Sequence, residues 1–144
     1  MSNVAVVYWS GTGNTAAMAR KVTKGITRAG GTADTMMARD FSPTKIDTYD
    51  AFAFGCPAMG KEQLEQKQFE PMYAEVEPLL TGKKVVLFGS YSWNHGEWMN
   101  IWKKRAEDAG LNVVGTLIVK DHPGIMHSGD CVRLGELIAK AAKA

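Results

Sequence analysis

Five short apolar runs recur along the chain, and segments with helical periodicity alternate with them. The apolar runs cover Val4–Trp9, Thr32–Met37, Ala51–Gly55, Lys84–Gly89 and Val113–Val119. Most runs are nearly continuous rather than alternating in polarity, which is typical of strands covered on both faces. The helical segments are Asn14–Ala29, Phe69–Leu80, Glu97–Ala109 and Asp130–Ala144. This alternation predicts an α/β fold, a doubly wound five-stranded parallel sheet with helices on both faces.

The length of the chain and the absence of an internal linker or repeat favour one domain over residues 1–144. Five strands of this kind favour the order 2-1-3-4-5, in which ligands bind beyond the carboxyl ends of the strands at the switch point. The loops after strands 1, 3 and 4 are therefore expected to converge on one site. These loops are Ser10–Thr15, Cys56–Glu65 and Ser90–Trp98.

The first loop has the composition of a phosphate site. It joins a strand to a helix, so free backbone N–H groups and the helix dipole face an anion there. No Lys or Arg occurs in residues 1–18, whereas four side-chain donors surround two glycines: Ser10, Gly11, Thr12, Gly13, Asn14 and Thr15. Neutral donors suit a single phosphate better than a triphosphate, which normally requires a lysine and a metal.

Three other interpretations of this loop remain open. The lysine of a Walker A motif is missing. A dinucleotide fingerprint is formally matched by Gly11, Gly13 and Ala16, but Asp34 falls inside the next predicted strand rather than at its end. A tight turn without a ligand would leave the four donors unexplained.

The other two loops add a flexible turn and aromatic surface. Gly60 can change backbone conformation, and Trp93 can either stack on a flat ligand or cap the core. Core packing is favoured for Trp98, and Trp9 and Trp102 are also interpreted as packing residues. A flat heteroaromatic ring on a ribityl-like arm with one terminal phosphate would fill such a site. That description fits flavin mononucleotide (FMN).

Composition argues against several other classes. The net charge of +2 is too small to indicate a nucleic-acid binder, and the three histidines lack metal-ligand spacing. Cys56 and Cys131 support neither a disulfide framework nor a zinc site, and Cys56 is predicted to be a small buried hydrophobe. No signal segment or membrane-length apolar run is present, so a cytoplasmic location is expected. Residues 61–77 are locally acidic, and the cluster 103–105 is predicted to be a solvated helix face.

Four segments together resemble the flavodoxin family. They are Tyr8-Trp9-Ser10-Gly11-Thr12-Gly13-Asn14-Thr15, Gly55-Cys56-Pro57-Ala58-Met59-Gly60, Phe88-Gly89-Ser90-Tyr91-Ser92-Trp93 and Gly96-Glu97-Trp98-Met99. The chain is most similar to short-chain flavodoxins of anaerobic bacteria, and the resemblance runs nearly end to end. It implies a low-potential carrier that binds FMN non-covalently, cycles between semiquinone and hydroquinone, and is not an enzyme.

The resemblance also implies roles for single residues. The first loop would hold the phosphate, Met59 would cover the inner flavin face, and Trp93 would stack on the outer face. The Gly60-Lys61 peptide would turn its carbonyl toward the flavin N5–H on reduction, and Glu62 would accept a hydrogen bond from N3–H. The implied cofactor-binding residues are Ser10, Gly11, Thr12, Gly13, Asn14, Thr15, Pro57, Ala58, Met59, Gly60, Lys61, Glu62, Ser90, Tyr91, Ser92, Trp93, Gly96, Trp98 and Asp121, with His122 as a further neighbour.

Two other functions are weighed against the electron carrier. An NAD(P)H-dependent quinone or flavin reductase would need a second pocket over the flavin, which a stacked Trp93 would block. A nucleotide-binding regulatory domain would not take up FMN. The expected partners are redox proteins that dock transiently near the exposed flavin edge, without nucleic acid or membrane, and the chain is expected to be a monomer. Unlike the usually acidic members of the family, this chain is slightly basic. Lys61 also lies in the turn at Gly60 that the resemblance places beside the flavin N5.

Overall fold

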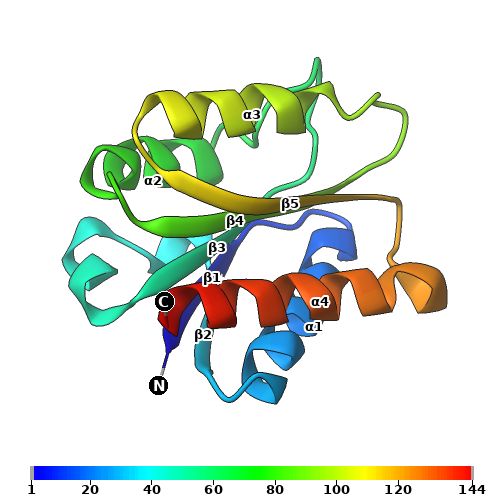
Figure 1. Ribbon diagram of the computed structural model, residues 1–144. Helices are drawn as coiled ribbons and strands as arrows, with labels where there is room; N and C mark the ends of the chain where they lie inside the picture. Colours follow the sequence, from blue (N-terminus) through cyan, green and yellow to red (C-terminus); the bar gives the residue numbers. More distant parts are fainter. Residues whose placement is uncertain (1, 144) are drawn as a thin grey trace.

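A computed structural model, which describes residues 2–143, has a parallel sheet between two layers of helices (Figure 1). The strands pair in the order β2-β1-β3-β4-β5, and all four pairings are parallel. Their bounds are Asn3–Tyr8 (β1), Thr32–Met37 (β2), Ala51–Gly55 (β3), Lys84–Tyr91 (β4) and Asn112–Lys120 (β5). The predicted fold class and strand order are therefore confirmed.

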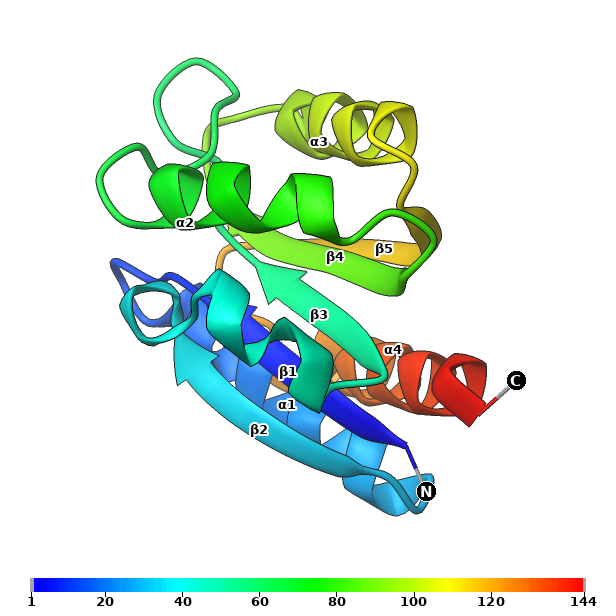
Figure 2. The same cartoon turned by 90° about the vertical axis from the view of Figure 1, so that its left-hand side faces the viewer.

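Two helices cover each face of the sheet. Figures 1 and 2 show α1 (Asn14–Arg28) and α4 (Gly124–Lys143) on one face, and α2 (Phe69–Val76) and α3 (Glu97–Asp108) on the other. Short 3₁₀ turns at Ala38–Asp40, Pro43–Thr48 and Glu77–Leu79 complete the connections. Each face has its own apolar cluster, and Phe52, Phe54, Trp98 and Trp102 are among the largest buried side chains on the α2/α3 side.

The central and edge strands differ in burial. Every residue of β3 is buried, as are the inner residues of β1 and β4, as their continuous apolar runs predict. The edge strands β2 and β5 carry mostly exposed or half-buried residues, so the deep burial of the central strands does not extend to them. Each edge strand lacks a neighbour on one side, and this leaves part of its surface open.

Most element boundaries lie within two residues of the prediction. The main differences are α4, which begins at Gly124 rather than Asp130, and α2, which ends at Val76 and continues as the 3₁₀ turn. Strand β4 also extends to Tyr91, so the loop that follows it is shorter than expected. The predicted end of the last helix, Ala144, lies outside the described residues.

The close approach of α1 and α4 fixes the helix that begins at the first loop. A Cβ on Gly25 would lie 1.9 Å from the Val132 carbonyl oxygen, and one on Gly135 would lie 2.0 Å from the Val22 oxygen. Two glycines thus allow the helix backbones to touch, where a methyl group would force them apart. The N-terminus of α1 is thereby held at the carboxyl end of β1.

Candidate functional site

A cleft of about 420 Å³ opens at the carboxyl ends of the strands. It lies at the switch point between β1 and β3, where doubly wound folds bind their ligands. The loops after β1, β3 and β4 converge there as predicted, and one residue after β5 joins them. The lining residues are Trp9, Ser10, Gly11, Thr12, Asn14, Thr15, Pro57, Ala58, Met59, Gly60, Ser90, Tyr91, Ser92, Trp93 and Asp121.

The loop between β1 and α1 is organised around the Ser10 hydroxyl. Its Oγ accepts the backbone N–H of Gly13 at 3.1 Å and that of Ala16 at 3.2 Å. With its acceptor sites occupied, the hydroxyl hydrogen of Ser10 remains available for an anion in the cleft. Gly13 does not line the cleft; it forms the N-cap of α1 with a φ of +100°.

The hydroxyl of Thr15 links this loop to β4. Its Oγ1 lies 3.0 Å from Oγ of Ser90, and both side chains are buried. The Ala58 N–H donates to the carbonyl of Ser90 at 3.0 Å, so the loop after β3 is attached at the same place. Ser90 therefore attaches the start of α1 and the loop after β3 to strand β4, and it lines the cleft itself.

Apolar and aromatic groups form much of the remaining lining, together with the polar residues Ser92 and Asp121. Met59, Pro57 and Ala58 come from the loop after β3, and Trp93 comes from the loop after β4. Trp93 is 70% exposed, so its indole is not part of the core. For this residue the structure thus favours the interpretation as a ligand-facing side chain over the one as a core cap.

Some predicted site residues lie beside the cleft rather than in its lining. Trp98 is buried, and its Nε1 donates to the Cys56 carbonyl at 3.2 Å, so it packs in the core as favoured. The Glu62 carboxylate accepts the backbone N–H groups of Trp98 at 3.0 Å and His95 at 3.3 Å. Glu62 therefore caps the start of α3. Three more predicted residues lie outside the lining: Lys61 and His122, which are exposed, and Gly96, the N-cap of α3.

Two residues near the cleft were missed by the sequence interpretation. Trp9, predicted to pack only, is half-buried and lines the cleft. Asn94 is 6% exposed, and its Nδ2 donates to the Gly60 carbonyl at 3.0 Å. A polar residue next to Trp93 was the only available signal for Asn94, because its partner lies 34 residues away.

The structure bears on the other interpretations of the first loop. Asp34 pairs with Ala5 in the middle of β2, and its carboxylate accepts the Tyr49 hydroxyl at 2.8 Å. Burial, together with this bond, raises the pKa of Tyr49 to about 12. Asp34 is therefore not at the end of the strand, where a dinucleotide ribose would meet it.

The described residues also give no support for a metal site, a reactive cysteine or a membrane-spanning helix. Within residues 2–143, no group of His, Cys, Asp and Glu is arranged to hold a metal ion. Burial raises the pKa of the Cys56 thiol far above its usual value, as expected of an inert core cysteine. Among the helices described, none is long and apolar enough to cross a membrane.

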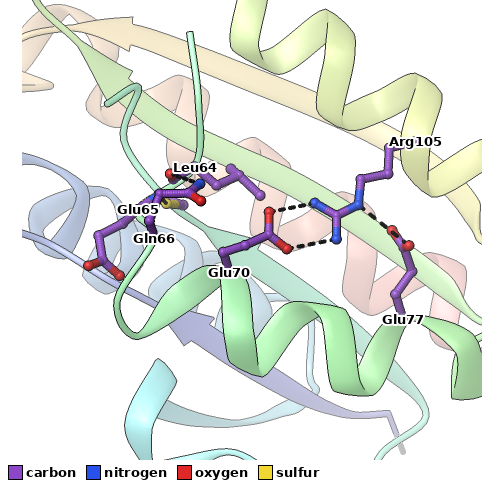
Figure 3. Close-up of polar contacts among 7 residues, drawn as sticks. Leu64, Glu65, Gln66, Glu70, Glu77 and Arg105 are labelled. Carbon is purple, nitrogen blue, oxygen red and sulfur yellow. Dashed lines mark hydrogen bonds and ion pairs between the residues drawn. The ribbon is translucent and has the colours of Figure 1, made fainter. Parts of the chain in front are cut away.

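The basic cluster at residues 103–105 is only partly a solvated face. Lys103 and Lys104 are exposed and pair with acids four residues further along α3. Arg105 instead donates to both oxygens of Glu70, at 2.7 and 2.8 Å, and its Nε lies 3.6 Å from Glu77 (Figure 3). The prediction is thus wrong for Arg105, because the buried Tyr73 ring and two acids on α2 and its 3₁₀ extension draw its guanidinium inward.

The cleft fits FMN in size and in donor chemistry. Its volume lies within the range of small-molecule sites, and such sites combine apolar walls with a few placed polar groups. Hydroxyl and amide donors gather at the N-terminus of α1, and the other two loops contribute the apolar and aromatic side chains of the lining, with Ser90 and Ser92 among them. One end therefore suits a phosphate, and the other suits a flat ring.

Comparison with known proteins identifies relatives along nearly the whole chain. A family model described as flavodoxin matches residues 6–135. The flavodoxin of Megasphaera elsdenii is 46% identical, over 96% of this chain and 99% of the relative. The flavodoxin of Clostridium beijerinckii is 42% identical, over 93% of this chain and 97% of the relative. The solution structure of two-electron reduced M. elsdenii flavodoxin superposes with a TM-score of 0.89, over 95% of this chain and 98% of that one.

Proposed function

The chain belongs to the flavodoxin family, and on this premise we propose that it shuttles single electrons between larger redox enzymes. FMN is its cofactor, and the chain is an electron-transfer flavoprotein rather than an enzyme. The carrier cycles between the semiquinone and hydroquinone forms at low potential. The observation that carries this proposal is one cleft that joins a cation-free loop of neutral donors to Met59 and Trp93.

The first loop would hold the phosphate. Ser10, Thr12, Asn14 and Thr15 supply side-chain donors, and the N-terminus of α1 adds its dipole. Because Ser10 already accepts the N–H groups of Gly13 and Ala16 at the start of α1, its hydroxyl is oriented before the ligand arrives. Preorganised donors lose little entropy on binding, so neutral groups are able to hold a doubly charged phosphate.

The loops after β3 and β4 would hold the ring. Met59 would cover its inner face, Trp93 would stack on its outer face, and backbone groups near Ser92 would meet its pyrimidine edge; all three residues line the cleft. The Gly60 carbonyl, which here accepts the Asn94 amide, would turn to accept a hydrogen bond from N5–H of the reduced ring. The carboxylate of Glu62 already accepts two backbone N–H groups at the start of α3. A hydrogen bond from the ring N3–H would therefore have to share these carboxylate oxygens.

When bound, FMN supplies the one-electron chemistry, and the protein sets the energy of each step. Apolar surroundings disfavour a second negative charge beside the phosphate, because burial penalises ionised groups. A carbonyl acceptor at Gly60 would favour the state of the ring in which N5 carries a proton. These two effects separate the two reduction steps and make the chain a carrier of single electrons.

The exposed indole of Trp93 marks the edge at which redox partners would dock. Electrons reach a partner most readily where the ring edge is closest to the surface. Transient docking of this kind is expected of a monomer. The oligomeric state and the cytoplasmic location stay predictions from the sequence.

A stepwise anaerobic reduction of the purified protein, followed by visible spectroscopy, tests the proposal. We expect the yellow protein to pass through a blue neutral radical before it bleaches. Direct bleaching without the radical would contradict one-electron transfer. The competing reductase function is tested in parallel, because turnover of NADPH with a quinone by the protein alone would replace the carrier assignment.

A further inference from the structure

The turn after Met59 stands out from the rest of the cleft. The backbones of Met59 and Gln63 exchange two hydrogen bonds, at 2.7 and 2.9 Å, so the three residues between them form a projecting loop. Gly60 lines the cleft with a φ of +50°, and a Cβ built on it would meet nothing within 4 Å. No atom packs against the open side of Gly60, so we expect hydrogen bonds to set the orientation of its peptide.

Side chains tie this turn to the loop that precedes α3. The Glu62 carboxylate accepts the N–H groups of His95 and Trp98, which fixes the far side of the turn. The Gly60 carbonyl accepts a hydrogen bond from Nδ2 of Asn94 at 3.0 Å. Within residues 2–143, no other side chain donates a hydrogen bond to the Gly60 carbonyl, and the Asn94 side chain is almost fully buried.

We propose that Asn94 is a positioning residue that holds the Gly60-Lys61 peptide in one orientation and thereby tunes the first midpoint potential of bound FMN. The proposal rests on the proposed function, in which the Gly60 carbonyl faces the flavin N5–H. The Asn94 amide and the ring compete for the same acceptor. A carbonyl that turns toward the ring must give up this partly buried bond, so Asn94 opposes the first reduction.

Asn94→Ala removes the amide donor without adding bulk. Loss of one net hydrogen bond should change the balance between the two peptide orientations by about threefold to tenfold. At 59 mV per decade for one electron, we expect the first midpoint potential to rise by roughly 30 to 60 mV. The second potential should stay within about 10 mV, because the Gly60 carbonyl serves the protonated N5 in both reduced states.

Asn100→Ala is the matched control, since it removes an exposed amide from α3 and leaves the turn unchanged. Both variants are loaded with FMN as full-length chains and titrated spectroelectrochemically beside the parent protein. A first potential that stays constant or falls in the Asn94 variant overturns the proposal. So does an equal shift of both potentials, which would indicate a general loosening of the site.

A second readout does not depend on the redox couple. The Lys61 amide belongs to the peptide that Asn94 holds, so its ¹⁵N–¹H resonance in the FMN-free chain should shift in Asn94→Ala and stay in place in Asn100→Ala. An unchanged Lys61 resonance overturns the proposed contact even where FMN binds normally. If the parent chain does not take up FMN, the proposed function is wrong. In that case the Lys61 resonance of the FMN-free variants still tests whether Asn94 holds the turn.

Discussion

Replacing Ser10 with alanine tests the phosphate end of the site. In the ligand-free chain the Ser10 hydroxyl accepts two backbone N–H groups, at 3.1 and 3.2 Å, and keeps its hydrogen for the cleft. A hydrogen bond to a charged group contributes about 1.5–3 kcal/mol. Since about 1.4 kcal/mol is a factor of ten, Ser10→Ala should weaken FMN binding by about 10- to 150-fold.

Riboflavin separates this effect from a general loss of structure. It carries the same ring and ribityl chain without the phosphate, so Ser10→Ala should change its dissociation constant by less than about threefold. Both ligands are titrated into the FMN-free protein, and quenching of flavin fluorescence is followed. Ser42→Ala is the control, because Ser42 makes one hydroxyl–hydroxyl contact with Thr44 in the 3₁₀ turn after β2.

The two titrations together allow the phosphate assignment to be refuted. Equal weakening of FMN and riboflavin would mean that Ser10 shapes the loop without contacting the phosphate. Unchanged binding of both ligands would mean that the loop between β1 and α1 does not hold the phosphate at all. Selective weakening of FMN alone supports the assignment.

Three further predictions concern the ring end and the framework. Trp93→Ala should weaken FMN and riboflavin by the same factor, about 2- to 10-fold, because stacking acts on the ring alone; selective loss of FMN would contradict this. Lys61→Glu should lower the second midpoint potential by about 10–40 mV, because it replaces an exposed cation near the anionic reduced ring by an anion. The shift is small because solvent screens exposed charges. A redox titration in which the second potential does not fall would refute this prediction. Glu65→Gln should lower the free energy of unfolding in urea by about 1–3 kcal/mol at pH 7, because the buried carboxylate accepts three backbone N–H groups at the start of α2. Burial raises the pKa of Glu65, but these bonds outweigh it and hold the pKa below its ordinary value of 4.5. The difference between parent and Glu65→Gln should therefore be complete above that pH and shrink as the pH falls through the lower folded-state pKa. An equal difference in strong acid would count against the role of the charge.

The strands and the converging loops could be predicted because their signals are local. An apolar run such as Ala51–Gly55 marks a buried strand by composition alone, and the residues after it are then placed by topology. The start of α4 was missed because residues 124–129 include Gly124 and Gly129, which are poor helix formers. Tertiary packing of α4 on α1 overrides that weak propensity.

The contacts that were missed are those between distant segments. In sequence, Arg105 looks like the last member of a uniform basic cluster, and nothing near it identifies Glu70 as its partner. Helical spacing does contain a partial signal, since Arg105 follows the buried Trp102 by three residues. Asn94 offers no such signal, because its bond to Gly60 depends on how two loops meet.

The acidic stretch at residues 61–77 shows how these contacts change a conclusion drawn from composition. Its local charge suggests a negative docking surface of the kind that steers basic partners. In the structure, Glu62 and Glu65 accept backbone N–H groups at helix starts, and Glu70 and Glu77 meet Arg105. Of the five acids, only Glu75 is exposed without such a contact among the described residues. The charge of the stretch still contributes to the long-range field, but few of its carboxylates are free for direct ion pairs. We therefore expect the exposed edge at Trp93, more than this stretch, to set how a partner docks.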